Sequence, residues 1–312
     1  YKNSIYLNSK LEKHEILAIK KIINKRITTR LPTPYITNEH WYGVPEVTFY
    51  VNKDVFVPRS PIQHKLQDFM KDVTWNNNKV LDLGAGSGAV GIILALLNPD
   101  IQVDLADICP KALKVAQINI DKYNLGKRVK CIQSDLFKNI KNKYDFIITV
   151  PPQISMEEYK TFVAEALHEP TISLISEKDG LKHIKSIIEE APKYLNSKGM
   201  LAAEIGLRLP NLIKAQYAHL KFKWFKFQNN DWIFSWKKKM NLKITTVTDM
   251  IRWGVSRMRE ADVHYFYFGD PDLLRTAHYL TFFALNLPYD YKNSIYLNSK
   301  LESSEISAVS RI

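Results

Sequence analysis

Apolar and polar positions alternate along the middle of the chain with two different periods. Short apolar runs at 80–83, 102–106 and 145–149 have the length of buried strands, whereas residues 90–97 are apolar with helical spacing. Strands that alternate with helices along a chain favour a parallel sheet with right-handed crossovers. The pattern therefore predicts an α/β fold built on a mostly parallel sheet.

Two pairs of aromatic stretches predict antiparallel hairpins. Residues 222–227 and 232–236 are rich in aromatic side chains and lysines, and they flank the polar segment 228–231. A half-buried strand pair explains this pattern, and a platform on which nucleic-acid bases stack is the alternative. Residues 49–51 and 55–57, on either side of Asn-Lys-Asp, predict a second hairpin nearer the start of the chain.

The two ends of the chain carry near copies of one segment, residues 1–22 and 291–312. In the first copy, a capping box of Ser9 and Glu12 precedes isoleucines with helical spacing, which predicts a helix. In the second copy, serines replace Lys13, His14, Leu17 and Lys20. We therefore expect the first copy to occupy the site on which this helix packs.

The periodicity becomes purely helical after the lysines 237–239, with apolar faces at 247–258 and 273–280. Met240 follows these lysines as an original first residue would follow an original C-terminus. Together with the repeated ends, this order predicts a circular permutation with a duplicated overlap, natural or engineered. An ordinary C-terminal helical domain is the alternative, but it leaves the repeat unexplained.

Composition limits the class of protein. Of the 312 residues 46% are hydrophobic, enough for a large core, and no apolar run approaches the roughly 20 residues that cross a bilayer. Nothing at the start resembles a signal peptide, so we expect no membrane contact and a cytoplasmic location. Cys109 and Cys131 have no metal-ligand spacing and should be reduced thiols. The net charge of +12 fits either a nucleic-acid neighbour or a lysine-rich proteome.

The first predicted strand ends in a glycine turn. Gly84, Gly86 and Gly88 occupy every second position before the helix, and Asp82 lies two residues before the first of them. Glycines at such a turn let the backbone approach a ligand in front of the helix N-terminus. A tight turn without a ligand is the alternative.

Two further acids follow later strands. Asp107 ends the second strand, where a carboxylate suits the paired hydroxyls of a ribose. Asp135 and Leu136 follow the third strand, where the carboxylate can accept from an adenine amino group and the apolar side chain can pack near the ring. Because the carboxyl ends of parallel strands share one edge of a sheet, we expect these residues to line one nucleoside site.

These motifs, in this order, resemble one family. Besides the glycine loop and Ser-Asp-Leu-Phe at 134–137, the chain carries Pro-Arg-Ser-Pro-Ile at 58–62 and His-Glu-Pro at 168–170. It resembles the glutamine methyltransferases of release factors and ribosomal proteins, above all the branch that acts on large-subunit ribosomal protein three. Once the order is rotated at Met240, the resemblance covers nearly the whole chain, and residues 246–260 resemble the start of the branch's N-terminal helical domain.

The resemblance implies a class I, Rossmann-like methyltransferase fold, S-adenosylmethionine as the cofactor and no metal. Residues 1–40 then belong to a helical substrate-recognition domain, 41–72 to a hairpin and linker, 73–239 to the methyltransferase domain, and 240–312 to the displaced remainder of the helical domain. The implied partner is a large-subunit ribosomal protein, near ribosomal RNA. A spare copy of a docking helix allows either a monomer or an exchanged dimer.

The departure from the family lies at the expected catalytic motif. The fourth strand ends in Val150, Pro151, Pro152 and Gln153, where the family has Asn-Pro-Pro-Tyr. In the family, the asparagine side chain and a proline carbonyl hold the target amide, whose planar nitrogen is a poor nucleophile and needs orienting. Valine offers no acceptor, and losing one preorganised group costs roughly 100- to 1,000-fold in rate. Gln153 substitutes in part at most, whereas the Pro151 carbonyl remains.

Two other interpretations stay open. One is a catalytically impaired binding protein, permuted or engineered, that keeps the cofactor site. The other is an adenine amino-group methyltransferase, which shares the acceptor motif; the Pro-Arg-Ser-Pro-Ile segment and the helical domain argue against it. We expect structural roles for His168 and Glu169, and for Glu204 near the substrate side.

Overall fold

The computed structural model divides the chain into two units, Tyr1–Lys239 and Met240–Ile312. It describes residues of the first unit only, namely 12–42, 47–177, 179–206, 209–226 and 232–238. The boundary between the units coincides with the change of periodicity at Met240. The predictions of a permutation and of a helical remainder at 240–312, which includes the second copy of the repeated segment, lie outside the described residues.

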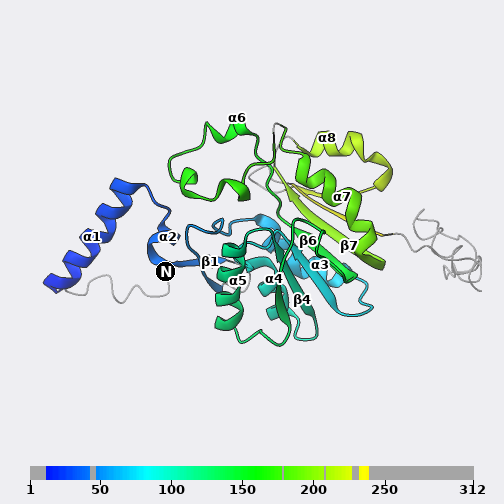
Figure 1. The fold of residues 1–312 in the computed structure, drawn as a ribbon, viewed down its shortest axis with the longest axis horizontal. Helices are drawn as coiled ribbons and strands as arrows, with labels where there is room; N and C mark the ends of the chain where they lie inside the picture. Colours follow the sequence, from blue (N-terminus) through cyan, green and yellow to red (C-terminus); the bar gives the residue numbers. More distant parts are fainter. Residues whose placement is uncertain (1–11, 43–46, 178, 207–208, 227–231, 239–312) are drawn as a thin grey trace, which may run out of the picture. The chain divides into compact units, whose positions relative to one another are not determined.

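A seven-stranded sheet organises the described part of the chain (Figure 1). All neighbouring strands run parallel except at β9, which is antiparallel to both its neighbours, so the predicted C-terminal hairpin is confirmed. The strands, in spatial order, are β5 (Val129–Gln133), β4 (Gln102–Asp107), β3 (Lys79–Leu83), β6 (Tyr144–Thr149), β7 (Leu195–Ile205), β9 (Trp232–Lys237) and β8 (Lys223–Lys226).

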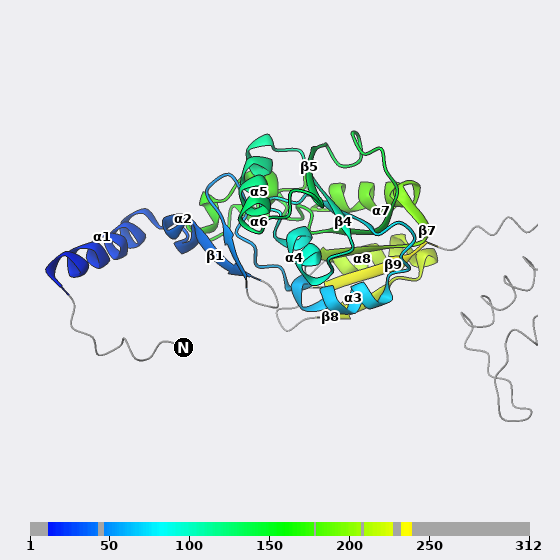
Figure 2. The same cartoon turned by 90° about the horizontal axis from the view of Figure 1, so that it is seen from below.

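Helices cover both faces of this sheet (Figures 1 and 2). The first face carries α3 (Leu66–Asp72), α4 (Ala89–Leu97) and α5 (Pro110–Lys122), and the second carries α7 (Lys182–Tyr194) and α8 (Leu209–Gln216). Each strand serves both layers because alternate side chains point to opposite faces. The shorter helical pieces are α2 (Thr33–Thr37), η2 (Pro61–Lys65), α6 (Met156–Tyr159), η3 (Ala166–His168), η4 (Thr171–Ser173) and η5 (Ala218–Leu220).

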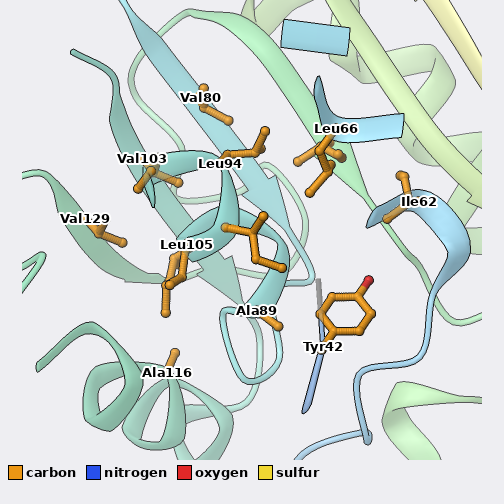
Figure 3. Packing of buried hydrophobic residues seen from close by; sticks show 14 of the residues in the cluster. Tyr42, Ile62, Leu66, Val80, Ala89, Leu94, Val103, Leu105, Ala116 and Val129 are labelled. Carbon is orange, nitrogen blue, oxygen red and sulfur yellow. The ribbon is translucent and has the colours of Figure 1, made fainter. Parts of the chain in front are cut away.

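The core under α4 fixes the position of the glycine turn. Figure 3 shows Leu105 of β4 between Leu94 of α4 and Ala116 of α5, with Val103 of β4 close by, and all four are buried. Gly88 has a φ angle of 77°, and a Cβ atom there would lie 2.8 Å from Leu105 Cδ1, so glycine is strongly favoured where α4 starts against β4. The packing of α4 against β4 therefore determines the position of the glycine turn that precedes the helix.

The predicted hairpin of residues 49–51 and 55–57 is wrong. The structure pairs β1 (Glu39–Tyr42) with β2 (Val47–Tyr50) instead. The outer edge of β2 is already occupied, because the Asn119 side chain accepts from the Tyr50 N–H and donates to the Tyr50 carbonyl. Residues after Tyr50 turn away, and Asn52 stabilises that turn by accepting from Asp54 N at 2.9 Å.

The predicted N-terminal helix is α1 (Lys13–Thr29), but its capping box uses Glu12 and Glu15 rather than Ser9 and Glu12. None of its residues is buried, so its isoleucines, with Leu17, lie exposed. Its C-terminal end is held by Glu165, whose carboxylate pairs with Arg26 at 2.9 Å. No helix in the described ranges is both long and apolar enough to cross a membrane.

Candidate functional site

Three of the predicted site segments lie on one edge of the sheet. Leu83, at the end of β3, is in register with Ala106 of β4 on one side and with Thr149 of β6 on the other. The glycine turn, Asp107 and Val150 follow these residues, so they meet at the carboxyl edge of the sheet. In open α/β sheets, ligands bind at this edge.

The glycine turn is hydrogen-bonded to β4 on one side, and none of the described residues packs against Gly84 and Gly86 on the other. The backbone N–H groups of Gly84 and Ala85 both donate to the Ala106 carbonyl, at 2.8 and 3.0 Å. Gly84 and Gly86 have φ angles of 75° and 55°, and a Cβ atom at either would meet no atom within 4 Å. These two glycines are therefore required by backbone conformation, and the space beside them is free for a ligand.

Asp107 touches the glycine turn directly. Its Oδ2 accepts from Gly86 N and its Oδ1 from Cys109 N, both at 2.8 Å. Burial raises the pKa of the Asp107 carboxyl above its ordinary value, and these two backbone N–H groups oppose the rise by stabilising the carboxylate. The two hydrogen bonds orient a carboxylate at the strand end, beside the turn.

Asp82 is predicted to bind the cofactor, but the structure places it inside the fold. It is 3% exposed, and its Oδ2 accepts from Gly91 N in the first turn of α4 at 2.8 Å. Burial raises the pKa of this carboxyl to about 7. Asp82 therefore connects β3 to α4 beneath the glycine turn, and it would act on a ligand only through that turn.

Asp135 and Leu136 follow β5, the next strand along the same edge. The Asp135 carboxylate is half-exposed and pairs with Lys138 at 2.6 Å. Leu136 has a φ angle of 46°, and its carbonyl accepts from the Ser134 hydroxyl at 2.6 Å. Ser134 thus stabilises an otherwise unfavourable backbone conformation at this edge of the sheet.

The segment after β6 lies next to the end of β7. Val150 is half-buried and packs against the core of the first face, whereas Pro151 is buried. The Gln153 side chain points across to β7, where its Oε1 accepts from Gly206 N at 2.5 Å. Its backbone N–H donates to the Leu174 carbonyl at 3.0 Å. Gln153 therefore anchors the segment that follows Val150.

The most informative residue that the sequence analysis missed is Asn119 of α5. It is fully buried, and its Nδ2 donates to the carbonyls of Tyr50 and Ser87 at 3.0 and 2.9 Å. Its Oδ1 accepts from Tyr50 N at 2.7 Å. One side chain thereby joins the β1–β2 hairpin to the glycine turn. A polar residue within the apolar face of α5 is the sequence signal that could have identified it.

The Pro-Arg-Ser-Pro-Ile segment is anchored at two points. Arg59 forms a bidentate ion pair with Glu169, at 2.6 and 2.9 Å, and the Glu169 side chain is only 3% exposed. Ser60 donates to the buried carboxylate of Glu204 at the end of β7. His168 Nε2 lies 2.9 Å from the Thr29 carbonyl at the end of α1. These contacts are those of structural residues, as expected for His168, Glu169 and Glu204.

Comparisons with known proteins agree with this architecture. Residues 64–221 match the methyltransferase small domain family. The chain is 37% identical over 232 residues to the ribosomal protein uL3 glutamine methyltransferase of Neisseria meningitidis serogroup B, covering 72% of this chain and 75% of that protein. It is 38% identical over 232 residues to the enzyme of the same name from Neisseria gonorrhoeae, covering 72% and 76%.

Among solved structures, a methyltransferase from Pyrococcus furiosus is 17% identical, with a TM-score of 0.46, covering 74% of this chain and all of that one. The glycine turn and the strand-end acids Asp107 and Asp135 lie within the matched residues 64–221. The chain belongs to the methyltransferase small domain family, alongside the ribosomal protein uL3 glutamine methyltransferases.

Proposed function

We propose that this protein uses S-adenosylmethionine to methylate the side-chain amide of a glutamine in a ribosomal protein of the large subunit. The observation that carries the proposal is the sequence identity of 37% and 38% over 232 residues to the two Neisseria enzymes. The geometry supports it, because an open glycine turn, an oriented carboxylate and the segment after β6 share one edge of the sheet.

The residues at this edge fit a sulfonium nucleoside. Asp107 presents a carboxylate next to the glycine turn, where the two oxygens can accept from ribose hydroxyls. Asp135 and Leu136 offer an acceptor and an apolar surface to the adenine, and Gly84 and Gly86 leave room for the chain that bears the sulfur. The cofactor supplies an electrophilic methyl group on a positively charged sulfur.

On the acceptor side, orientation is the main task of the protein. The lone pair of an amide nitrogen is delocalised into the carbonyl, so the nitrogen attacks only when its N–H groups are held by acceptors that fix its direction. The Pro151 carbonyl is such an acceptor, and the side chain of Val150 is not. With one side-chain acceptor missing, we expect slow turnover, roughly 100- to 1,000-fold below that of an asparagine variant.

A second candidate is a cofactor-binding protein that does not transfer the methyl group. It is favoured by one observation, the apolar side chain of Val150 packed against the core where an acceptor would be needed. The two candidates share the cofactor site and differ only in the reaction. They make opposite predictions for the fate of the target glutamine.

The experiment that separates them incubates the full chain with S-adenosylmethionine and a large-subunit ribosomal protein, followed by mass spectrometry of the protein. A gain of one methyl group on a glutamine, faster with Val150→Asn, supports the transferase. Cofactor binding by calorimetry without any methylated glutamine, in wild type and variant alike, supports the binding protein. Absence of cofactor binding by the folded chain would refute both.

A further inference from the structure

Residues 150–153, here called the acceptor segment, contain two positions that cannot donate a backbone hydrogen bond. Pro151 and Pro152 have no backbone N–H, so neither residue can be fixed by donating a hydrogen bond. Before them, the Thr149 hydroxyl donates to the Leu83 carbonyl at 2.7 Å and ties the end of β6 to β3. After them, the next residue with a backbone donor is Gln153.

Gln153 makes two contacts that point in different directions. Its backbone N–H donates to the Leu174 carbonyl, and its side-chain Oε1 accepts from Gly206 N just beyond β7. The Gln153 side chain also fills the space beside Gly206, where a Cβ atom would lie 3.6 Å from Oε1. The two prolines therefore span the distance between two fixed points, Thr149 on one side and Gln153 on the other.

We propose that Gln153 is a positioning residue, whose side-chain carbonyl, held by the Gly206 amide, sets where the Pro151 carbonyl meets the target amide. This inference rests on the proposed function for its consequence in catalysis, but the contact itself does not. Proline restricts φ to one narrow range, so a shift at Gln153 is passed back along the segment instead of being absorbed within it. A displacement of about 1 Å at a positioning group can lower a rate by about 100-fold.

The role assigned to Gln153 is that of its oxygen atom. Gln153→Glu keeps an oxygen that accepts from Gly206 N, whereas Gln153→Met has nearly the same length and no comparable acceptor. If the amide NH₂ group were the functional part, both variants would fail. Gln102→Met, at the exposed start of β4 and at the opposite edge of the sheet, is the matched control.

The first measurement is hydrogen exchange of the Gly206 amide by NMR in the full chain. We expect exchange about tenfold faster in Gln153→Met, the effect of losing one hydrogen bond, and rates close to wild type in Gln153→Glu and Gln102→Met. Equal exchange rates in Gln153→Met and the control would overturn the proposal, because the hydrogen bond from Gly206 N to the Gln153 side chain would then not exist in solution.

The second measurement is steady-state methyl transfer to the large-subunit ribosomal protein. We expect kcat to fall at least tenfold in Gln153→Met with the KM for S-adenosylmethionine unchanged, and Gln153→Glu to restore most of it. A fall of the same size in both variants would overturn the role of the oxygen. Absence of transfer by the wild type would refute the proposed function, and the exchange rates would still decide whether the hydrogen bond between Gly206 and Gln153 forms in solution.

Discussion

Replacing Asn119 by alanine should destabilise the fold and weaken cofactor binding together. The side chain is fully buried and makes three hydrogen bonds, two to Tyr50 and one to the Ser87 carbonyl in the glycine turn. Alanine removes all three and leaves the partner groups on the hairpin and in the turn without this amide. The change therefore affects two elements of the site at once.

The magnitude follows from these contacts. A buried hydrogen bond contributes about 1 kcal/mol net, so three of them amount to about 3 kcal/mol, and the cavity left by the amide adds to this. Asn119→Asp keeps the acceptor for Tyr50 N but faces two carbonyl oxygens with a charge, so we expect it to be at least as destabilising at neutral pH. Gln117→Ala, on the exposed side of the same helix, should change stability by no more than about 0.5 kcal/mol.

The assay is chemical denaturation of the full chain, with calorimetric titration of S-adenosylmethionine on the folded variants. We expect the free energy of unfolding to fall by about 3 kcal/mol in Asn119→Ala and the affinity for the cofactor to fall with it. A loss below about 1 kcal/mol would show that Asn119 is not the link between hairpin and turn. A full loss of stability with unchanged affinity would show that the turn does not need the link.

Three further predictions concern single side chains. Burial raises the pKa of Asp82 from 3.8 to about 7, so its contribution to stability is present below pH 4 and is lost as the pH rises to 7. In denaturation at a series of pH values, the free energy of unfolding of Asp82→Asn should therefore increase relative to that of the wild type over this range. Parallel pH dependences of the two proteins would contradict this. Arg59→Met removes the donors to both buried Glu169 oxygens and should lower the free energy of unfolding by about 2 kcal/mol, less than is usual for a buried pair because Arg59 is half-exposed. The double variant Arg59→Met with Glu169→Gln should recover part of this stability, and strictly additive effects of the two substitutions would refute the pairing. Val150→Asn should raise kcat by roughly 100- to 1,000-fold in the methyl-transfer assay, and an unchanged kcat would show that the side-chain acceptor is not limiting.

Much of the candidate site at the carboxyl edge of the sheet could be predicted from the sequence. The glycine turn follows a buried strand and precedes an apolar helix, and Asp107 and Asp135 follow the next two strands, so local periodicity and strand order suffice to bring them to one edge. The same reasoning predicted the β8–β9 hairpin. It placed Asp82 among the ligand contacts, because periodicity does not say which strand residues reach the surface. The structure shows that this carboxylate lies beneath the turn.

The tertiary structure alone decided the contacts between residues far apart in sequence. Tyr50 and Asn119 are 69 positions apart, and Gln153 and Gly206 are 53 apart. Local patterns determine which residues form a strand or a turn, because those depend on near neighbours. The contacts of Asn119 with the edge of β2, and of Gln153 with Gly206 N, depend instead on how the helices pack against the sheet. For this reason the sequence by itself determined the sheet and brought the glycine turn and the strand-end acids to one edge. The partner of β2 and the hydrogen bond from Gly206 to Gln153 were decided only by the tertiary packing.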